Sequence, residues 1–383
     1  MYRIFYAERD TTLYERYPQQ NTGIDQILEL TKIASGSKFN GLIQARTYNT
    51  RFIVDFGTEI NTLSASIGSG EIPKISTHPD SASVYLNLHA ADASDLLTSY
   101  EIKAYPVSES WTNGAGNYTD IPIIKYGASW YYRTSEDTGD YWTTGSFAAN
   151  TTGSGGLQEI GGGTWWTGSG YAASQSFQNE SPDVRMNVTD IVAKWVTGSG
   201  GIDNNGFIIK RPTHDEISGQ VLGNLKFFSR ETHTIYVPKL EVAWNDTTLP
   251  SAYTDISEIS ADTYVPYFKN IKREYRTSEI TKFRIGVRPE FPEKLFQTSS
   301  FYLTGERLPT SSFYSIFDSV TNEVIIPFDS VATKIDGDSK GSFFKLRMDT
   351  FMPERYYKIM LKIERDGGND IQTYDDFYFK VVN

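Results

Sequence analysis

The residue types that carry out most enzyme chemistry are sparse or scattered in this sequence. The chain has four histidines and no cysteine, which excludes thiolate nucleophiles and zinc sites of the cysteine type. Neither His78 nor His89 nor any other histidine belongs to a His-Glu-x-x-His pair. The phosphate-binding Gly-Lys-Ser/Thr loop is also absent. We therefore predict no catalytic residue, no metal site and no cofactor.

Acidic side chains are numerous, but their pattern marks no site. The stretch DGDSKG at 336–341 begins like a calcium loop. Lys340 and Arg347 then stand at positions where such a loop supplies oxygen ligands, so we interpret the stretch as an Asp-Gly turn. No motif marks the pair of carboxylates that a glycosidase needs. A polysaccharide-degrading enzyme is our least favoured hypothesis.

Aromatic residues are the feature of this chain that could bind a ligand. The chain has 25 Tyr, 22 Phe and 7 Trp, and most of the tryptophans lie between Trp111 and Trp195. Exposed aromatic rings offer flat faces to sugars, and aromatic residues are also enriched at protein interfaces. The candidates for glycan stacking are Trp130, Trp142, Trp165 and Trp166. We favour the alternative, in which the cluster packs a core and contacts another subunit.

One short helix is predicted within a chain of strands, in NVTDIVAKWVTGSGGIDNNGFIIK at 187–210. The apolar residues at helical spacing are Val188, Ile191, Val192 and Trp195. A helix of about two turns is not stable alone, so we expect this face to pack on the end of a β-sandwich. The NNG turn and the strand FIIK follow. A catalytic role for Asp190 is the less favoured alternative.

The rest of the sequence indicates short strands between turns. The segments TRFIVDFG at 50–57 and SASVYLNLHA at 81–90 alternate apolar and polar residues with the period of a strand. The segment 25–33 fits either a helix or a strand, and we favour a strand. Beyond residue 266, seven further short strands suggest a second, smaller sandwich of immunoglobulin size. One of them is SSFYLTG at 299–305.

Length, charge and composition bound the remaining possibilities. A chain of 383 residues predicts two or more domains. We place the first at 1–245 with a glycine-rich insertion at 145–171, a linker at 246–266, and the second at 267–383. The net charge of −11 argues against nucleic acid as a partner. We also expect no membrane span, because no run of 18 apolar residues occurs, and no signal peptide at the start.

Residues 1–245 resemble the DNRLRE module of disaggregatase-related and surface proteins in the order of their motifs. The opening AERDTTLYERYPQQNTGIDQILEL is similar to the module's strand and its Pro-x-x-Asn-x-Gly turn. The segments NTRFIVDFG, SASVYLNL, PVSESWTNGAG, MNVTDIVAKWVTG with NNGFIIK, and KFFSRET with PKLEVAW follow in the module's order. The resemblance implies a jelly-roll β-sandwich without catalysis of its own, and some such modules bind polysaccharide. The fold we expect is therefore all-β, with an N-terminal jelly-roll-like β-sandwich followed by a smaller immunoglobulin-like β-sandwich.

Nearly the whole chain, including YVPYFKNIKREYRTSEITKFRIGVRPEFP, also resembles virion structural proteins of T4-like marine tailed phages, cyanophages above all. This resemblance implies a non-enzymatic virion component that is synthesised in the host cytoplasm. Its place would be the tail, baseplate, neck or capsid surface, and we favour the tail or neck. The implied partners are other virion proteins, with several copies in a symmetric assembly. A carbohydrate-binding adhesion module that recognises a cell-surface glycan is the alternative.

Overall fold

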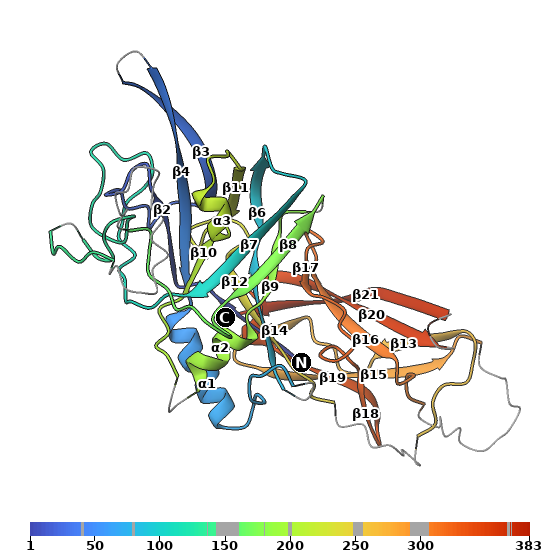
Figure 1. Ribbon diagram of the computed structural model, residues 1–383. Coiled ribbons are helices and arrows are strands. Elements are labelled where there is room, and N and C mark those ends of the chain that lie inside the picture. Colours follow the sequence, from blue (N-terminus) through green and yellow to red (C-terminus); the bar gives the residue numbers. More distant parts are fainter. Residues whose placement is uncertain are drawn as a thin grey trace, which may run out of the picture. The chain divides into compact units, whose positions relative to one another are not determined.

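The computed structural model describes residues 1–39, 42–78, 81–135, 137–142, 161–179, 181–197, 201–247, 256–291, 306–365, 368 and 370–383. Nearly all of the regular structure in these residues is β (Figure 1). The predicted all-β sandwich class is confirmed. Most of the glycine-rich segment 145–171, part of the predicted linker and the predicted strand at 299–305 lie outside the described residues.

The chain forms two compact units. The larger unit is Phe5–Glu241, and the smaller one combines Met1–Ile4 with Val242–Asn383. The predicted boundary at residue 245 therefore lies a few residues beyond the observed division. Part of the predicted linker is regular structure, because a strand of the smaller unit begins at Tyr264. Pro266 lies in that strand. The strand was not predicted, because a proline and the polar residues before it are typical of a linker.

The strands from Tyr2 to Ala243 form two sheets. One has the order β1-β12-β5-β9, and the larger has the order β6-β11-β3-β4-β10-β7-β8 with β2 pairing with β4. Their bounds are β1 (Tyr2–Tyr6), β2 (Arg9–Tyr14), β3 (Ile27–Phe39), β4 (Leu42–Asp55), β5 (Ser83–Leu88), β6 (Ala90–Ser94), β7 (Ser99–Pro106), β8 (Ala173–Gln178), β9 (Val184–Asn187), β10 (Phe207–Lys210), β11 (Gly223–Phe228) and β12 (Lys239–Ala243). Segment 25–33 enters β3, as predicted.

The last part of strand β4, Asn49–Asp55, is buried on both faces, and this arrangement positions the site described below. Phe52 contacts Phe227 of β11, with ring centroids 5.7 Å apart. The face of β4 that carries Phe52 is therefore covered by apolar side chains. Because side chains alternate along a strand, Arg51, Ile53 and Asp55 share the opposite face. Ile53 packs there in a cluster with Trp111, Trp130, Trp142 and Trp165.

The predicted helix is α2 (Thr189–Val196). Ile191 and Val192 are buried, Val188 is buried just before the helix begins, and the Trp195 ring lies 4.5 Å from that of Phe207 in β10. The expected apolar face is therefore confirmed. Two other helices were not predicted, α1 (Gly57–Gly68) and α3 (Thr213–Ile217). Ile60, Leu63 and Ile67 of α1 do lie at helical spacing, and this signal was missed, whereas α3 has only five residues and gives no pattern.

The smaller unit contains two further sheets, of order β13-β15-β19-β18 and β14-β21-β20-β16-β17. An aromatic contact joins them, because Tyr314 of β16 stacks on Phe344 of β19 with centroids 4.2 Å apart. The bounds are β13 (Tyr264–Phe268), β14 (Glu274–Arg276), β15 (Ile280–Pro289), β16 (Ser312–Asp318), β17 (Val324–Ile326), β18 (Asp336–Asp338), β19 (Gly341–Arg347), β20 (Arg355–Arg365) and β21 (Asp370–Val382), with a 3-10 turn at Met348–Thr350.

Candidate functional site

Three of the four tryptophans predicted to bind a glycan are buried. Trp130, Trp142 and Trp165 are only 1–2% exposed, so none of them offers a ring face to a sugar. The prediction of a tryptophan platform is therefore wrong for these residues. Trp166 is half-buried and stacks on Tyr171, with ring centroids 6.1 Å apart. Trp130, Trp142 and Trp165 pack together in a buried core cluster, as the core-packing part of the favoured alternative predicts.

The buried tryptophans attach a lobe of irregular chain to the large sheet. This aromatic lobe comprises residues 108–135, 137–142 and 161–166. The Trp142 indole N–H donates to the carbonyl of Ser129 within the lobe (2.9 Å), and the Trp111 indole N–H donates to the carbonyl of Asn205 (2.8 Å). Val107, at the end of β7, forms an isolated β-bridge with Trp165. The lobe thereby covers the face of the sheet that carries Arg51 and Ile53.

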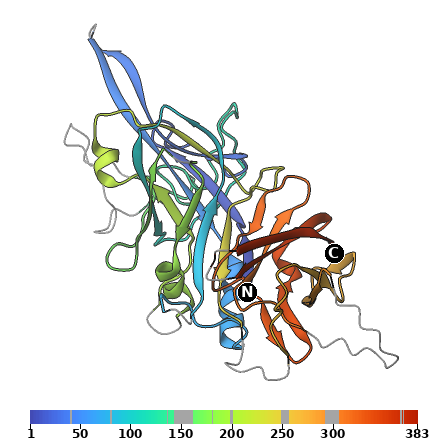
Figure 2. The ribbon, with the colours of Figure 1, turned by 90° about the vertical axis from the view of Figure 1, so that its right-hand side faces the viewer.

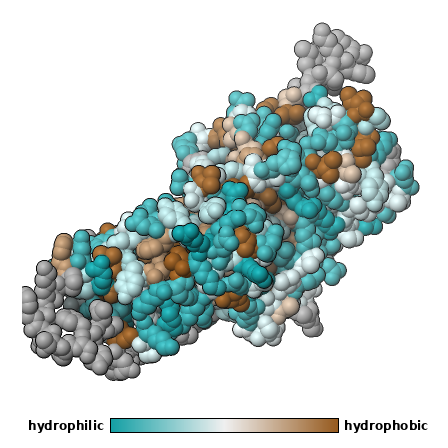
Figure 3. Space-filling view, turned by 180° about the vertical axis from the view of Figure 1, so that it is seen from behind, coloured by the Kyte–Doolittle hydropathy of each residue, from teal (hydrophilic) through white to brown (hydrophobic). Residues whose placement is uncertain are grey.

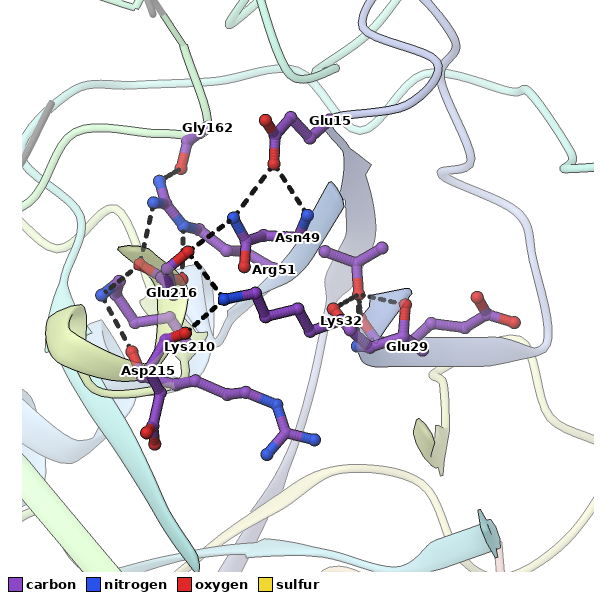
Figure 4. Close-up of polar contacts among 12 residues, drawn as sticks. Glu15, Glu29, Lys32, Asn49, Arg51, Gly162, Lys210, Asp215 and Glu216 are labelled. Carbon is purple, nitrogen blue, oxygen red and sulfur yellow. Dashed lines mark hydrogen bonds and ion pairs between the residues drawn. The ribbon is translucent and has the colours of Figure 1, made fainter. Parts of the chain in front are cut away.

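A buried ionic cluster lies where the lobe meets the sheet (Figure 4). Glu216 of α3 accepts hydrogen bonds from Arg51 Nε (2.9 Å) and Nη2 (3.0 Å), and Lys210 Nζ lies 2.7 Å from the same carboxylate. All three side chains are 1% exposed. Arg51 also donates to the carbonyl of Gly162 in the lobe (2.7 Å). One guanidinium therefore connects β4, α3 and the lobe.

The cluster also contacts the buried indoles directly. The Arg51 guanidinium lies 4.9 Å from the ring of Trp130 and 5.2 Å from that of Trp165, and Lys210 Nζ lies 5.3 Å from the Trp165 ring. Cations at such distances are attracted to the ring face, and the attraction grows when water is excluded. The tryptophans thus stabilise the cations that hold the lobe in place.

The cluster is tuned to keep Glu216 ionised. Burial alone raises the pKa of Glu216, but Arg51 and Lys210 together outweigh that effect and hold the pKa below its ordinary value. Burial lowers the pKa of Lys210, and only Glu216 strongly opposes this. Lys32 of β3 donates to the carbonyls of Asp215, Glu216 and Ser218 at the end of α3. A cation there suits the negative end of the helix.

Asn21 of the Pro-x-x-Asn-x-Gly turn fastens the other side of the lobe. Its amide N–H₂ donates to the carbonyls of Asn113 (2.7 Å) and Ala128 (2.8 Å), and its side-chain oxygen accepts from the backbone N–H of Gly23 and Gly116. The side chain is fully buried. Gly114, whose φ is +80°, lies so close that a Cβ there would be 2.3 Å from the Asn21 oxygen. The turn and the lobe therefore pack so closely that only a glycine fits at position 114.

The outer face of the lobe carries tyrosines. Tyr118, Tyr131 and Tyr141 are 44%, 37% and 50% exposed, and Tyr17 of the preceding turn is 37% exposed. The Tyr17 and Tyr118 rings are 5.9 Å apart, and the Tyr141 ring packs at a tilt against the buried Tyr132 with centroids 4.7 Å apart. A backbone hydrogen bond from Tyr131 to the carbonyl of Pro18 joins the two groups. We call these four exposed residues the tyrosine surface.

The tyrosine surface is the candidate functional site of the described structure. Tyrosine offers a large apolar ring with a hydroxyl group and has few rotatable bonds, which suits contacts to proteins and to sugars. Nothing in the spacing of these residues marks them as exposed. The chain has many tyrosines, and only the anchoring of the lobe through its tryptophans decides which of them face outward.

His89 and Asp338, two reactive groups that the sequence singles out, are held by structural contacts. His89 packs on Tyr236, with rings 5.0 Å apart, and burial lowers its pKa. Asp338, in the predicted Asp-Gly turn, is held by Arg284 (2.8 Å) and Lys282 (2.8 Å). Within the described ranges, no three His, Asp or Glu side chains are placed to hold a metal ion. None of the described helices is long and apolar enough to cross a membrane.

Comparisons with known proteins give no family. No family model matches the chain, and no curated protein matches it. A DUF4785 family protein from Legionella pneumophila aligns over 100% of this chain at 7% identity and a TM-score of 0.17. The β-glucuronidase of Parabacteroides merdae aligns over 97% at 10% identity and a TM-score of 0.16. The chain spans 62% and 35% of those two proteins, and likenesses of this size carry no argument on fold or function.

Proposed function

We propose that this chain is a non-enzymatic structural component of a tailed-phage virion that acts through protein–protein contacts. The order of motifs in residues 1–245 and the likeness of nearly the whole chain to virion structural proteins are the sequence grounds for this proposal. The tyrosine surface is the observation that carries it. Its neighbours would be other virion proteins, and the tail or neck is the favoured position.

The physical argument concerns how rigidly the tyrosine surface is presented. An interface gains affinity when its side chains lose little freedom on binding. The aromatic lobe has little regular structure, yet the Arg51–Glu216 cluster and Asn21 fix it from two sides. The face drawn in Figure 3 is mostly hydrophilic with scattered hydrophobic residues. On that face no broad apolar patch is available for contact, so aromatic residues with polar ends are better suited to bind a partner.

The experiment is co-sedimentation of the chain with assembled particles. A Tyr118→Ser, Tyr141→Ser variant is supplied during infection beside a control, Tyr267→Ser with Tyr356→Ser, whose two rings are 42% and 54% exposed in the smaller unit. We expect the control to enter particles at the wild-type level and the lobe variant to lose most of its incorporation. Equal incorporation of both variants would overturn the role of the tyrosine surface. Absence of the wild-type chain from particles would overturn the virion assignment itself.

The alternative is a carbohydrate-binding adhesion module, and the same exposed tyrosine rings favour it. A sugar would stack on Tyr118 or Tyr141, because the indoles of Trp130, Trp142 and Trp165 are out of reach. A glycan array with the purified chain tests this alternative. Retention of a defined glycan that the Tyr118→Ser, Tyr141→Ser variant loses would favour adhesion. If the wild-type chain retains no glycan on the array, the adhesion alternative is wrong. Turnover of any glycan on the array would contradict the non-enzymatic assignment.

A further inference from the structure

The hairpin of β3 and β4 extends well beyond the sheet to which it belongs. Strand β11 pairs with β3 only as far as Lys32, and β2 pairs with β4 only from Thr50 onward. The two strands continue to pair with each other from Lys32–Asn49 to Phe39–Leu42. Figures 1 and 2 both show this ribbon projecting past the rest of the larger unit. We call residues 33–39 with 42–47 the arm.

Both outer edges of the arm lack a strand partner among the described residues. No third strand pairs with Ile33–Phe39 or with Leu42–Thr47 in the described structure. An isolated two-stranded ribbon is at best marginally stable in water. A row of unpaired backbone N–H and C=O groups on such a ribbon is a template for another strand. Pairing with a further strand would therefore satisfy the backbone groups along one edge of the arm and stabilise it.

A second long unpaired edge lies on β21 in the smaller unit. The parallel strand β14 pairs with β21 only at Lys380, Val381 and Val382. Residues 370–374 and 377–379 of β21 pair with β20 on one side, with a register shift at Asp375 and Asp376, and no described strand pairs with their other side. Their side chains are mostly exposed or half-buried. This stretch is long enough to accept either strand of the arm.

Four other sheet edges in the described structure have features that discourage an added strand. Strand β13 contains Pro266, which removes a backbone donor. The first backbone N–H of β6, at Ala90, is already bonded to the Asp183 carboxylate (2.8 Å). Strands β17 and β18 are only three residues long. The edge of β21 carries acidic residues, and its one irregularity is the register shift at Asp375 and Asp376, which leaves residues 370–374 as a regular unpaired run.

The charges of the two unpaired edges are complementary. Lys38 and Arg46 are the only charged residues of the arm, in a chain of net charge −11. Residues 370–379 contain Asp370, Asp375 and Asp376 and no basic residue. Lys358 of β20 lies 3.4 Å from Asp375, which is still 54% exposed. An acidic edge repels another acidic edge but attracts a basic strand, so the charges select the arm as the added strand.

We propose that the arm of one copy of this chain adds as a strand to the β21 edge of a second copy. Backbone hydrogen bonds would supply affinity and the opposite charges would supply selectivity. Donor and acceptor are different surfaces, so the contact is head-to-tail and propagates into a ring or a filament. The inference does not depend on the virion assignment, although a symmetric assembly would accommodate such a contact.

Sedimentation velocity over a range of concentrations tests the proposal. The wild-type chain is expected to form oligomers in a concentration-dependent manner. Replacing residues 34–47 by Asn-Gly joins Ile33 to Tyr48, which pair in the same phase as Phe39 and Leu42, through a favoured two-residue turn. This variant is expected to remain a monomer. A wild-type chain that stays monomeric up to about 1 mM, or an arm deletion that leaves association unchanged, overturns the proposal.

Charge reversal keeps the test decisive if the arm deletion fails to fold. Lys38→Glu with Arg46→Glu, and separately Asp375→Lys with Asp376→Lys, should each weaken association by at least about tenfold. Combining all four substitutions should restore association to near the wild-type level. The control is Asp92→Lys on the edge of β6, which should leave association unchanged. Failure of the combined variant to recover, or equal weakening by the control, contradicts a specific arm-to-edge contact.

Discussion

Replacing Glu216 by Gln is expected to loosen the attachment of the aromatic lobe to its sheet. The amide keeps the shape of the carboxylate but removes its charge, which leaves Arg51 and Lys210 buried without a counter-ion. Both cations are 1% exposed, so water cannot compensate. Breaking one side of a buried ion pair costs about 3–5 kcal/mol. We expect a loss of free energy of unfolding in this range.

The Arg51 contacts of 4.9 Å and 5.2 Å to Trp130 and Trp165 make the indoles reporters of the lobe. Urea unfolding followed by tryptophan fluorescence therefore measures the expected loss. The matched control is Asp215→Asn in the same helix, since that side chain is 23% exposed and its ion-pair contact is to His214 (3.3 Å). For an exposed pair we expect a change below about 1 kcal/mol.

The pairing also predicts a coupling and a pH dependence. Arg51→Met combined with Glu216→Gln should cost clearly less than the sum of the two single changes, because the contact is lost only once. The lowered pKa of Glu216 means that its stabilisation is present above its unfolded value of 4.5 and is lost as the pH falls through the folded pKa. A Glu216→Gln loss no larger than that of Asp215→Asn, or strictly additive effects, would refute the reasoning.

Two further predictions concern buried polar groups in the larger unit. Burial raises the pKa of Asp10 to about 7, although a hydrogen bond from the backbone N–H of Arg230 acts to lower it. Between pH 3.8 and about 7 the carboxyl is therefore protonated in the folded state and ionised in the unfolded state. Stability should therefore fall as the pH rises from 4 to 7, by up to about 4 kcal/mol. Asp10→Asn should remove that slope in urea midpoints compared at pH 5 and pH 8, and an unchanged slope would contradict it. Asn21→Ala removes four hydrogen bonds and should cost about 2–4 kcal/mol in thermal unfolding. The control is Asn117→Ala, a half-buried position whose side chain bonds only within its own turn in the described structure, and equal melting temperatures of the two variants would contradict the prediction.

The fold class was predictable because the apolar periods of the strands are clear. Strands β4, β5, β7 and β10 follow from runs such as Phe52, Val54 and Phe56. The same runs hide that the last part of β4, Asn49–Asp55, is buried on both faces, since Arg51 and Asp55 look like exposed positions in a sequence. Their burial depends on Glu216 and Arg9, which lie far away in the chain.

The candidate site was predictable only in composition. The sequence indicated an aromatic cluster near Trp130 and favoured a core role for it, but it did not indicate which aromatic rings of the region would be exposed. The large indoles fill the space between lobe and sheet, whereas the tyrosines retain a hydroxyl that favours water. The helix face of Val188, Ile191, Val192 and Trp195 was predictable because its spacing is local. Contacts such as those of Asn21 join residues about a hundred positions apart, and no local pattern encodes them.

The most direct test of the account is quantitative mass spectrometry of purified virions, following the tryptic peptide from Met186 to Lys194. The proposed role predicts this peptide in intact particles, at a copy number that is a whole multiple of a rotational symmetry of the particle. Particles that lack the peptide, or contain it only in traces unrelated to that symmetry, would contradict the account and leave the glycan-binding module as the hypothesis to pursue.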